Sequence, residues 1–183
     1  RMACVSKVIW MVSLVLAGCA GFVAWQGLTL RSDRSRLVLE DIPFDGRRAY
    51  EYLQALCKIG PRPSGSPGVK AQQELLVAHF EKLGAEVSLQ SFTGVDPRNR
   101  TPVPMANFVA RFFPERTERI LLCAHYDTLP YPLRDRVNPR GRFVGANDGA
   151  SGVALLMELA HRLDRIPEGL GVDIVFFDGE EFI

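Results

Sequence analysis

The sequence predicts an α/β fold built around a mixed β-sheet. Segments with the apolar pattern of strands alternate with segments whose apolar residues recur at helical spacing. Short polar motifs follow several of the predicted strands, and in sheets of this class ligands bind at the carboxyl ends of the strands. We therefore expect one α/β domain with a functional site at one edge of its sheet.

Composition and charge define the class of protein and exclude one kind of partner. With 183 residues, 47% of them hydrophobic and 23% charged, the chain has the size and composition of one globular domain with a tail. Its formal net charge is +1 and its basic residues form no sustained stripe, which argues against a nucleic acid partner. We divide it into a targeting segment at 1–30, a linker at 31–46 and a domain at 47–183.

The N-terminal segment has the character of a membrane anchor. No charged residue lies between Lys7 and Arg31, and as a helix these 23 positions would span about 35 Å, enough to cross a bilayer. Two alternatives remain open. The segment is an uncleaved signal anchor, or residues 16–19 form a lipoprotein processing box in which Cys19 is lipidated. Either way we expect a membrane-anchored protein whose domain lies outside the cytoplasm.

Three helices and four strands are expected in the domain. The helices, placed by helical spacing of apolar residues, are 47–58, 69–83 and 150–163. The strands, placed by alternating or continuous apolar residues, are 86–92, 106–113, 120–124 and 172–177. The Gly- and Pro-rich stretch 60–68 is expected as a loop, as is the polar stretch 129–142. Cys57 and Cys123, among apolar neighbours, are expected as buried thiols and not as a disulfide.

A histidine and an aspartate follow one of the predicted strands. His125 alone is more commonly a packed or surface residue than a metal ligand. Asp127 strengthens the case for a metal ligand, because residues two apart lie on the same side of an extended chain. Its carboxylate could accept the second ring N–H of the imidazole and fix the tautomer. By itself this pair is a weak indication.

Two further acidic patches make a metal centre the better hypothesis. Asp148 precedes the predicted 150–163 helix, where an N-cap is the simplest interpretation. Glu180 and Glu181 follow a buried apolar strand, where adjacent carboxylates are costly unless charge nearby compensates them. A divalent cation would do so, with one carboxylate as ligand and the other free to accept a proton from bound water. Because all the patches fall at one predicted sheet edge, together they indicate a metal site.

Four motifs of the sequence resemble those of the zinc exopeptidases, a family that includes aminopeptidases and animal-type glutaminyl cyclases. They occupy residues 60–68 (GPRPSGSPG), 124–128 (AHYDT), 145–154 (GANDGASGVA) and 176–181 (FFDGEE). The resemblance implies a three-layer α/β fold of the phosphorylase/hydrolase type, with a central mixed sheet and one or two zinc ions. It further implies the following roles: His125, Asp148 and Glu181 as metal ligands, Asp127 as the residue that orients His125, and Glu180 as the general acid/base.

Two activities on peptide N-termini are compatible with this resemblance. The 176–181 motif is closer to the glutaminyl cyclases, in which Glu180 would move a proton from the N-terminal amine to leaving ammonia and so form pyroglutamate. In that case one zinc would be held by Asp148, Glu181 and a later His, and His125 would be only a neighbour. In an aminopeptidase Glu180 would instead activate a zinc-bound water against the first peptide bond.

A third alternative is a non-catalytic binding ectodomain of the same fold. The presence of both Glu180 and Glu181 argues against it. The family's later histidine ligand would lie beyond Ile183, so we expect a C-terminally truncated chain. As given, we expect it to bind zinc weakly and to have no useful activity.

Overall fold

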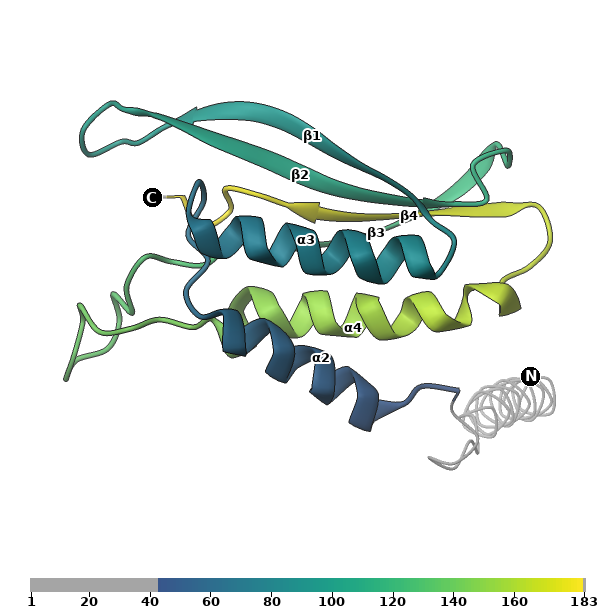
Figure 1. Ribbon diagram of the computed structural model, residues 1–183, viewed down its shortest axis with the longest axis horizontal. Coiled ribbons are helices and arrows are strands. Elements are labelled where there is room, and N and C mark those ends of the chain that lie inside the picture. The colour runs from purple at the N-terminus through teal and green to yellow at the C-terminus, as the bar shows by residue number, and fades with distance from the viewer. Residues whose placement is uncertain (1–42, 183) are drawn as a thin grey trace, which may run out of the picture. The chain divides into compact units, whose positions relative to one another are not determined.

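The computed structural model describes residues 43–182, which form a four-stranded sheet with helices packed against it (Figure 1). The predicted targeting segment at 1–30 and most of the predicted linker lie outside the described residues. Among the residues that are described, no helix is long and apolar enough to span a membrane.

The first two helices begin and end at residues that favour helix boundaries. Helix α2 (Gly46–Ile59) begins after Asp45, whose side chain accepts a hydrogen bond from the Arg48 N–H at 3.0 Å. Helix α3 (Pro67–Lys82) begins after Ser66, which caps the helix in the same way, with proline at its first position. Both predicted helices are confirmed, but the predicted loop ends two residues early, because Pro67 and Gly68 belong to α3.

The four strands form the mixed sheet that the sequence predicts. They are β1 (Glu86–Val95), β2 (Pro102–Phe112), β3 (Glu118–His125) and β4 (Leu170–Phe177). Their order is β1-β2-β4-β3, with β1 and β4 antiparallel to β2, and with β3 parallel to β4. The register pairs His125 with Phe177. The parallel strands β3 and β4 therefore end side by side, and the motifs that follow them emerge at one edge of the sheet.

The connection between these strands contains the third predicted helix. It is helical in two parts, α4 (Ser151–Leu159) and the 3₁₀ segment η3 (Ala160–Arg165), where the sequence predicts one helix over 150–163. A short irregular segment, η2 (Ala146–Ala150), precedes α4 and contains non-helical backbone at Asp148 and Gly149. The predicted loop at 129–142 has no helix or strand.

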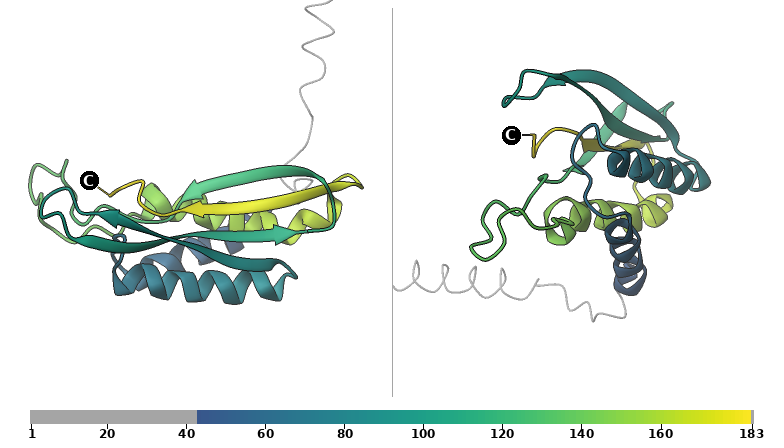
Figure 2. Two further views of the ribbon diagram at one scale, coloured as in Figure 1. Left: turned by 90° about the horizontal axis from the view of Figure 1, so that it is seen from above. Right: turned by 60° about the vertical axis from the view of Figure 1, so that its left-hand side comes forward.

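The hydrophobic core lies between one face of the sheet and the helices. Phe80 of α3 packs against Phe108 and Phe176, with ring centroids 5.5 and 5.8 Å apart, and all three side chains are fully buried. Figure 2 shows α3 and α4 along this face of the sheet, with α2 on the far side of α4. At about 25 cal/mol per Å² of apolar area, this burial is the main stabilising contribution to the fold.

The other face of the sheet has no helix over it within residues 43–182. Leu121 is 59% exposed there, and Cys123 on the same side of β3 is also exposed. The expectation of a buried thiol is therefore wrong for Cys123, and Cys57 is only partly buried. The mixed α/β sheet is confirmed, whereas the three-layer arrangement stays a prediction.

Candidate metal centre

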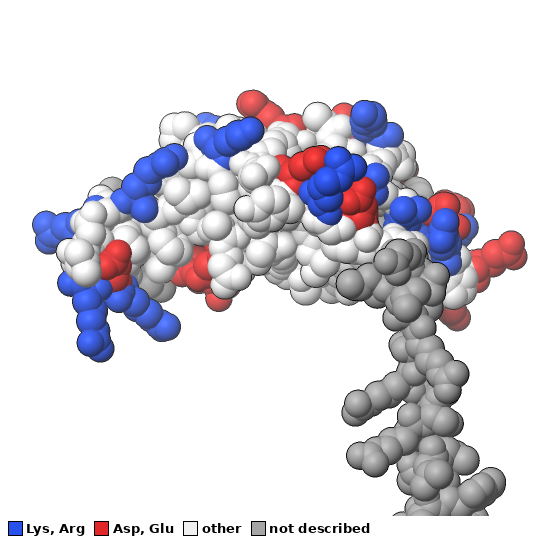
Figure 3. Space-filling view, turned by 90° about the horizontal axis from the view of Figure 1, so that it is seen from below, with Lys and Arg blue, Asp and Glu red and all other residues white. Residues whose placement is uncertain are grey.

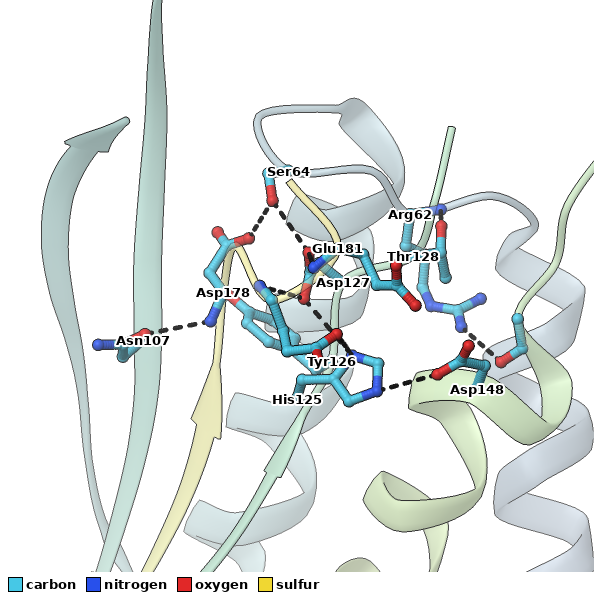
Figure 4. Close-up of polar contacts among 12 residues, drawn as sticks. Arg62, Ser64, Asn107, His125, Tyr126, Asp127, Thr128, Asp148, Asp178 and Glu181 are labelled. Carbon is cyan, nitrogen blue, oxygen red and sulfur yellow. Dashed lines mark hydrogen bonds and ion pairs between the residues drawn. The ribbon is translucent and has the colours of Figure 1, made fainter. Parts of the chain in front are cut away.

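The predicted site residues converge where β3 and β4 end (Figure 4). His125 is the last residue of β3, and Asp178 is the first residue after β4. The imidazole Nε2 of His125 lies 3.1 Å from the Asp148 carboxylate, and its Nδ1 lies 3.8 Å from the Glu180 carboxylate. Three segments that are far apart in the sequence therefore present their polar side chains to one small volume.

Asp127 lies buried next to these side chains and fixes the backbone of the two glutamates. Its side chain is fully buried and accepts hydrogen bonds from the backbone N–H groups of Glu180 at 3.3 Å and Glu181 at 2.9 Å. The sequence predicts that it orients His125, but its oxygen lies 3.6 Å from the His125 Nδ1, too far for a hydrogen bond. The Nδ1 atom is buried and has no hydrogen-bond partner among the described residues. Asp127 thus positions the two glutamates more directly than the histidine.

The local structure at Asp148 excludes the simplest alternative role. No side chain caps η2 or α4, so Asp148 is not a helix N-cap. Its backbone is extended (φ −97°, ψ 106°), and its side chain is half exposed toward His125. The next residue, Gly149, has φ +90°, and a Cβ there would lie 2.8 Å from the Asp127 carbonyl oxygen. A glycine is therefore required for the turn to approach β3 so closely.

The donor set is suited to a zinc ion. Histidine nitrogen and carboxylate oxygen are ligands that zinc accepts, and bonds of about 2.1 Å in tetrahedral geometry place two ligand atoms about 3.4 Å apart. The 3.1 Å separation of His125 and Asp148 is close to that value. Among the described residues, however, no three His, Cys, Asp or Glu side chains are already arranged to hold one ion. The candidate ligands therefore approach one another in pairs, such as His125 and Asp148, and do not form a complete coordination site among the described residues.

Electrostatics at Glu181 also indicate a place for positive charge. Burial and, next to it, the Asp148 carboxyl raise the pKa of Glu181 to about 7. Glu180 adds a third negative charge nearby, with His125 as the counteracting group. A bound cation would relieve this repulsion between carboxylates.

The structure adds supporting residues to which the sequence assigns no role. Asp178 accepts hydrogen bonds from the Ser64 hydroxyl at 2.7 Å and from the Ala106 N–H at 3.0 Å. Burial raises the pKa of Asp178. The same Ser64 hydroxyl lies 3.3 Å from Asp127, and so connects the two buried carboxyl groups. Ser64 and Asp178 belong to motifs visible in the sequence, but only the folded structure places them in contact.

A cavity of about 380 Å³ adjoins the candidate ligands. Asp148 and Glu181 form one side of it, and Leu129, Leu133 and Phe143 supply apolar surface from the 129–142 loop and the residue that follows it. Lys and Arg side chains gather at the end of the molecule where this loop lies (Figure 3). The cavity is therefore an opening with a partly apolar wall beside the acidic cluster.

Comparisons with known proteins identify the family. Residues 107–183 match the model of Peptidase family M28. A glutaminyl-peptide cyclotransferase-like protein of Mus musculus is 35% identical to 66% of this chain. The crystal structure of Fimbriiglobus ruber glutaminyl cyclase is 49% identical over 78% of this chain, with a TM-score of 0.74. The structure of a leucine aminopeptidase precursor from Bacteroides thetaiotaomicron is 35% identical over 76% of it, with a TM-score of 0.69.

The chain spans only part of each of these relatives. It covers 32% of the mouse protein and 48% of each of the two solved structures. Within that span the TM-scores of 0.74 and 0.69 show that this chain shares its mixed sheet and helices with the two solved structures. The chain therefore belongs to the zinc exopeptidase family of aminopeptidases and glutaminyl cyclases, peptidase family M28.

Proposed function

We propose that these residues belong to a zinc-dependent glutaminyl cyclase, which converts an N-terminal glutamine of a peptide into pyroglutamate with loss of ammonia. The convergence of Asp148, Glu181 and His125 beside Glu180 carries the proposal that the protein is a zinc enzyme. The 49% identity to a glutaminyl cyclase over 78% of the chain favours the cyclase over other activities of the family.

In this proposal Asp148 and Glu181 hold the zinc ion. His125 is a third ligand where two ions are bound, and a neighbour of the site where there is one. When bound, the zinc supplies Lewis acidity that polarises the side-chain amide carbonyl of the substrate glutamine. Asp127 contributes by fixing the backbone of both glutamates, which sets the direction of their carboxylates.

Glu180 has the role of proton carrier. Its carboxylate is 61% exposed and faces the same volume as the candidate ligands. It accepts a proton from the substrate's N-terminal amine as that nitrogen bonds to the amide carbon of the side chain. It returns the proton to the amide nitrogen, which leaves as ammonia when its bond to carbon breaks.

The second candidate function is a zinc aminopeptidase. The leucine aminopeptidase precursor of Bacteroides thetaiotaomicron, with a TM-score of 0.69, supports it. The same Glu180 would then act as base for a water that attacks the first peptide bond. Both reactions need a free peptide N-terminus, and the cavity beside Asp148 and Glu181 would receive the N-terminal residue in either case.

Incubation of the zinc-loaded full-length protein with two peptides, one beginning with glutamine and one with leucine, tests the proposal. We expect the glutamine peptide to lose ammonia and remain uncleaved, and the leucine peptide to be unchanged. Release of free leucine or glutamine would contradict the cyclase and support the aminopeptidase. A folded Glu180→Gln variant is the matched control, in which either activity should fall by a factor of about 10²–10⁴.

A further inference from the structure

Arg62 is a completely buried arginine beside the candidate metal centre. It lies in the loop between α2 and α3, and none of its surface is exposed. It takes part in no ion pair with a carboxylate among the residues that the structure describes. A buried cation without an acidic partner is costly, so the contacts that hold it in place require an explanation.

Its guanidinium joins two separate parts of the fold. Nη1 donates hydrogen bonds to the carbonyl oxygens of Gly60 at 2.6 Å and Leu56 at 3.3 Å, at the C-terminal end of α2. Nη2 lies 3.4 Å from the carbonyl oxygen of Gly145, to which it donates across 83 residues of sequence. The negative end of the α2 dipole offsets part of the cost of burying the cation.

The backbone of Arg62 makes a second link to the site. Its N–H donates to the Thr128 hydroxyl at 3.0 Å, and its carbonyl accepts the Thr128 N–H at 3.1 Å. Thr128 is buried and immediately follows Asp127. Arg62 is thus hydrogen-bonded both to Thr128, just after β3, and to Gly145, three residues before Asp148 (Figure 4).

The turn at Gly145 is where this link acts on the candidate ligand. Gly145 has a left-handed backbone (φ +59°), and a Cβ there would lie 2.5 Å from the Asp148 carbonyl oxygen and 2.6 Å from the Thr128 methyl group. The turn therefore leaves no room for a side chain at Gly145 and lies in close contact with the backbone of Asp148. The Gly145 carbonyl oxygen accepts hydrogen bonds from the Ala150 N–H at 3.1 Å and from Arg62 Nη2 at 3.4 Å. A lysine has no planar fork with which to reach both this oxygen and the end of α2.

We propose that Arg62 is a positioning residue for the metal centre, because its guanidinium ties the end of α2 to the Gly145 turn that presents Asp148. This inference rests on the proposed function, since it assumes that Asp148 binds the metal. Arg62 itself touches neither the metal nor the substrate. Its loss acts through Asp148, as the loss of groups that orient metal ligands does elsewhere.

Titration of Co²⁺ into the metal-free full-length protein tests this role without an activity assay. We expect Arg62→Met and Arg62→Lys each to raise the Co²⁺ dissociation constant by a factor of about 10–100 and to change the visible absorption bands of bound Co²⁺. Lysine keeps the charge but cannot bridge α2 and the turn. A Kd within twofold of the unmodified protein in either variant, with an unchanged spectrum and an intact fold by circular dichroism, would overturn the proposal.

Arg119 offers a matched control for the effect of stability alone. It also donates to several backbone carbonyls, including those of Phe112, Phe113 and Arg116, but it lies at the start of β3, at the opposite end of the strand from His125. Arg119→Met should lower the melting temperature and leave the Co²⁺ affinity unchanged. An equal loss of affinity in this control would assign the Arg62 effect to stability and overturn the inference.

Two further comparisons cover the remaining outcomes. If neither Arg62 variant folds, Thr128→Val removes the hydroxyl that accepts the Arg62 N–H and should still raise the Kd; an unchanged Kd would count against the link. An unmodified protein that binds neither Co²⁺ nor Zn²⁺ would contradict the proposed function, and the inference with it. Normal metal binding together with insensitivity to Arg62 would contradict the inference alone.

Discussion

At the scale of single residues, the carboxylates of the site differ in what holds them. Asp127 is fully buried and fixed by two backbone N–H groups, whereas the Asp148 side chain is half exposed and caps no helix. Glu181 is placed against Asp148 so that burial and this neighbour raise its pKa to about 7. In the metal-free protein Asp127 is therefore a structural group, and Asp148 and Glu181 are groups under mutual repulsion.

Asp148→Asn should separate stability from metal binding. Removal of one of two repelling carboxylates, with no cap lost, should leave the free energy of unfolding of the metal-free protein within about 0.5 kcal/mol of its original value, or raise it. The same change should weaken zinc binding by a factor of at least about 100, because an amide is a poor substitute for a carboxylate ligand. Denaturant unfolding and competition with a chromophoric chelator measure the two effects. A loss of about 1 kcal/mol or more would contradict the prediction and show that the Asp148 carboxylate stabilises the metal-free fold, as through its 3.1 Å approach to His125.

Asp127→Asn should impair function more than its conservative size suggests. The neutral amide presents one oxygen where two oxygens now accept the Glu180 and Glu181 N–H groups, so both glutamates lose part of their anchor. We expect metal affinity and kcat/KM each to fall by a factor of about 10–100. Asp173→Asn, in an ion pair with Arg119 away from the site, is the matched control and should change neither. Unaltered kcat/KM in Asp127→Asn would refute this role.

At the scale of elements, the helices meet in a polar cluster remote from the site. The Tyr52 hydroxyl lies 2.7 Å from the His161 Nε2, and the His79 Nε2 lies 3.0 Å from the Met157 carbonyl oxygen, to which it donates. The fully buried Glu158 of α4 receives the Arg48 guanidinium of α2 at 2.6 Å. This cluster joins α2, α3 and α4, and so supports the helical layer that carries the Gly145 turn.

The two histidines of this cluster should make stability depend on pH. Burial lowers the pKa of both His79 and His161 below the usual value near 6.5, so the unfolded chain binds more protons than the folded chain in this range. The histidines' contribution is therefore complete above about pH 6.5 and decreases as the pH falls through their folded pKa values.

Comparison with a His79→Gln/His161→Gln variant isolates this contribution, because Glu181, whose raised pKa acts in the opposite direction, is common to both proteins. Urea unfolding between pH 7.5 and 5.5 should show the parent losing stability relative to the variant as the pH falls. Parallel stability curves for the two proteins would contradict the assignment.

At the scale of the whole molecule, the periodic signals were sufficient for the sheet and its helices. The residues at 172–177 are apolar except for Asp173 and predict a buried strand, which the structure extends to Leu170–Phe177. The start of α3 could also have been found, since Ser66 followed by Pro67 is a helix-start signal that was outweighed by glycine and proline density. The expectation of a buried Cys123 is wrong because an apolar strand pattern does not say which face of the sheet is covered.

The sequence predicts which residues gather at the candidate site, but not the contacts that support them. His125, Asp148 and the two glutamates stand out because each follows or precedes a regular element. Arg62 and Ser64 act only because a loop folds back across the ends of β3 and β4, and no local pattern encodes such a contact. The sequence predicts that Asp127 orients His125, whereas in the structure it binds the backbone of the glutamates. The two outcomes differ by less than 1 Å, because Asp127 lies 3.6 Å from the His125 Nδ1 and 2.9 Å from the Glu181 backbone nitrogen.

The most direct test of the metal centre is anomalous diffraction at the zinc absorption edge from zinc-saturated crystals of the full-length protein. We expect an anomalous peak about 2.0–2.2 Å from carboxylate oxygens of both Asp148 and Glu181, with a second peak beside His125 only if two ions bind. A zinc-saturated crystal with no peak in contact with Asp148 and Glu181 would contradict this expectation.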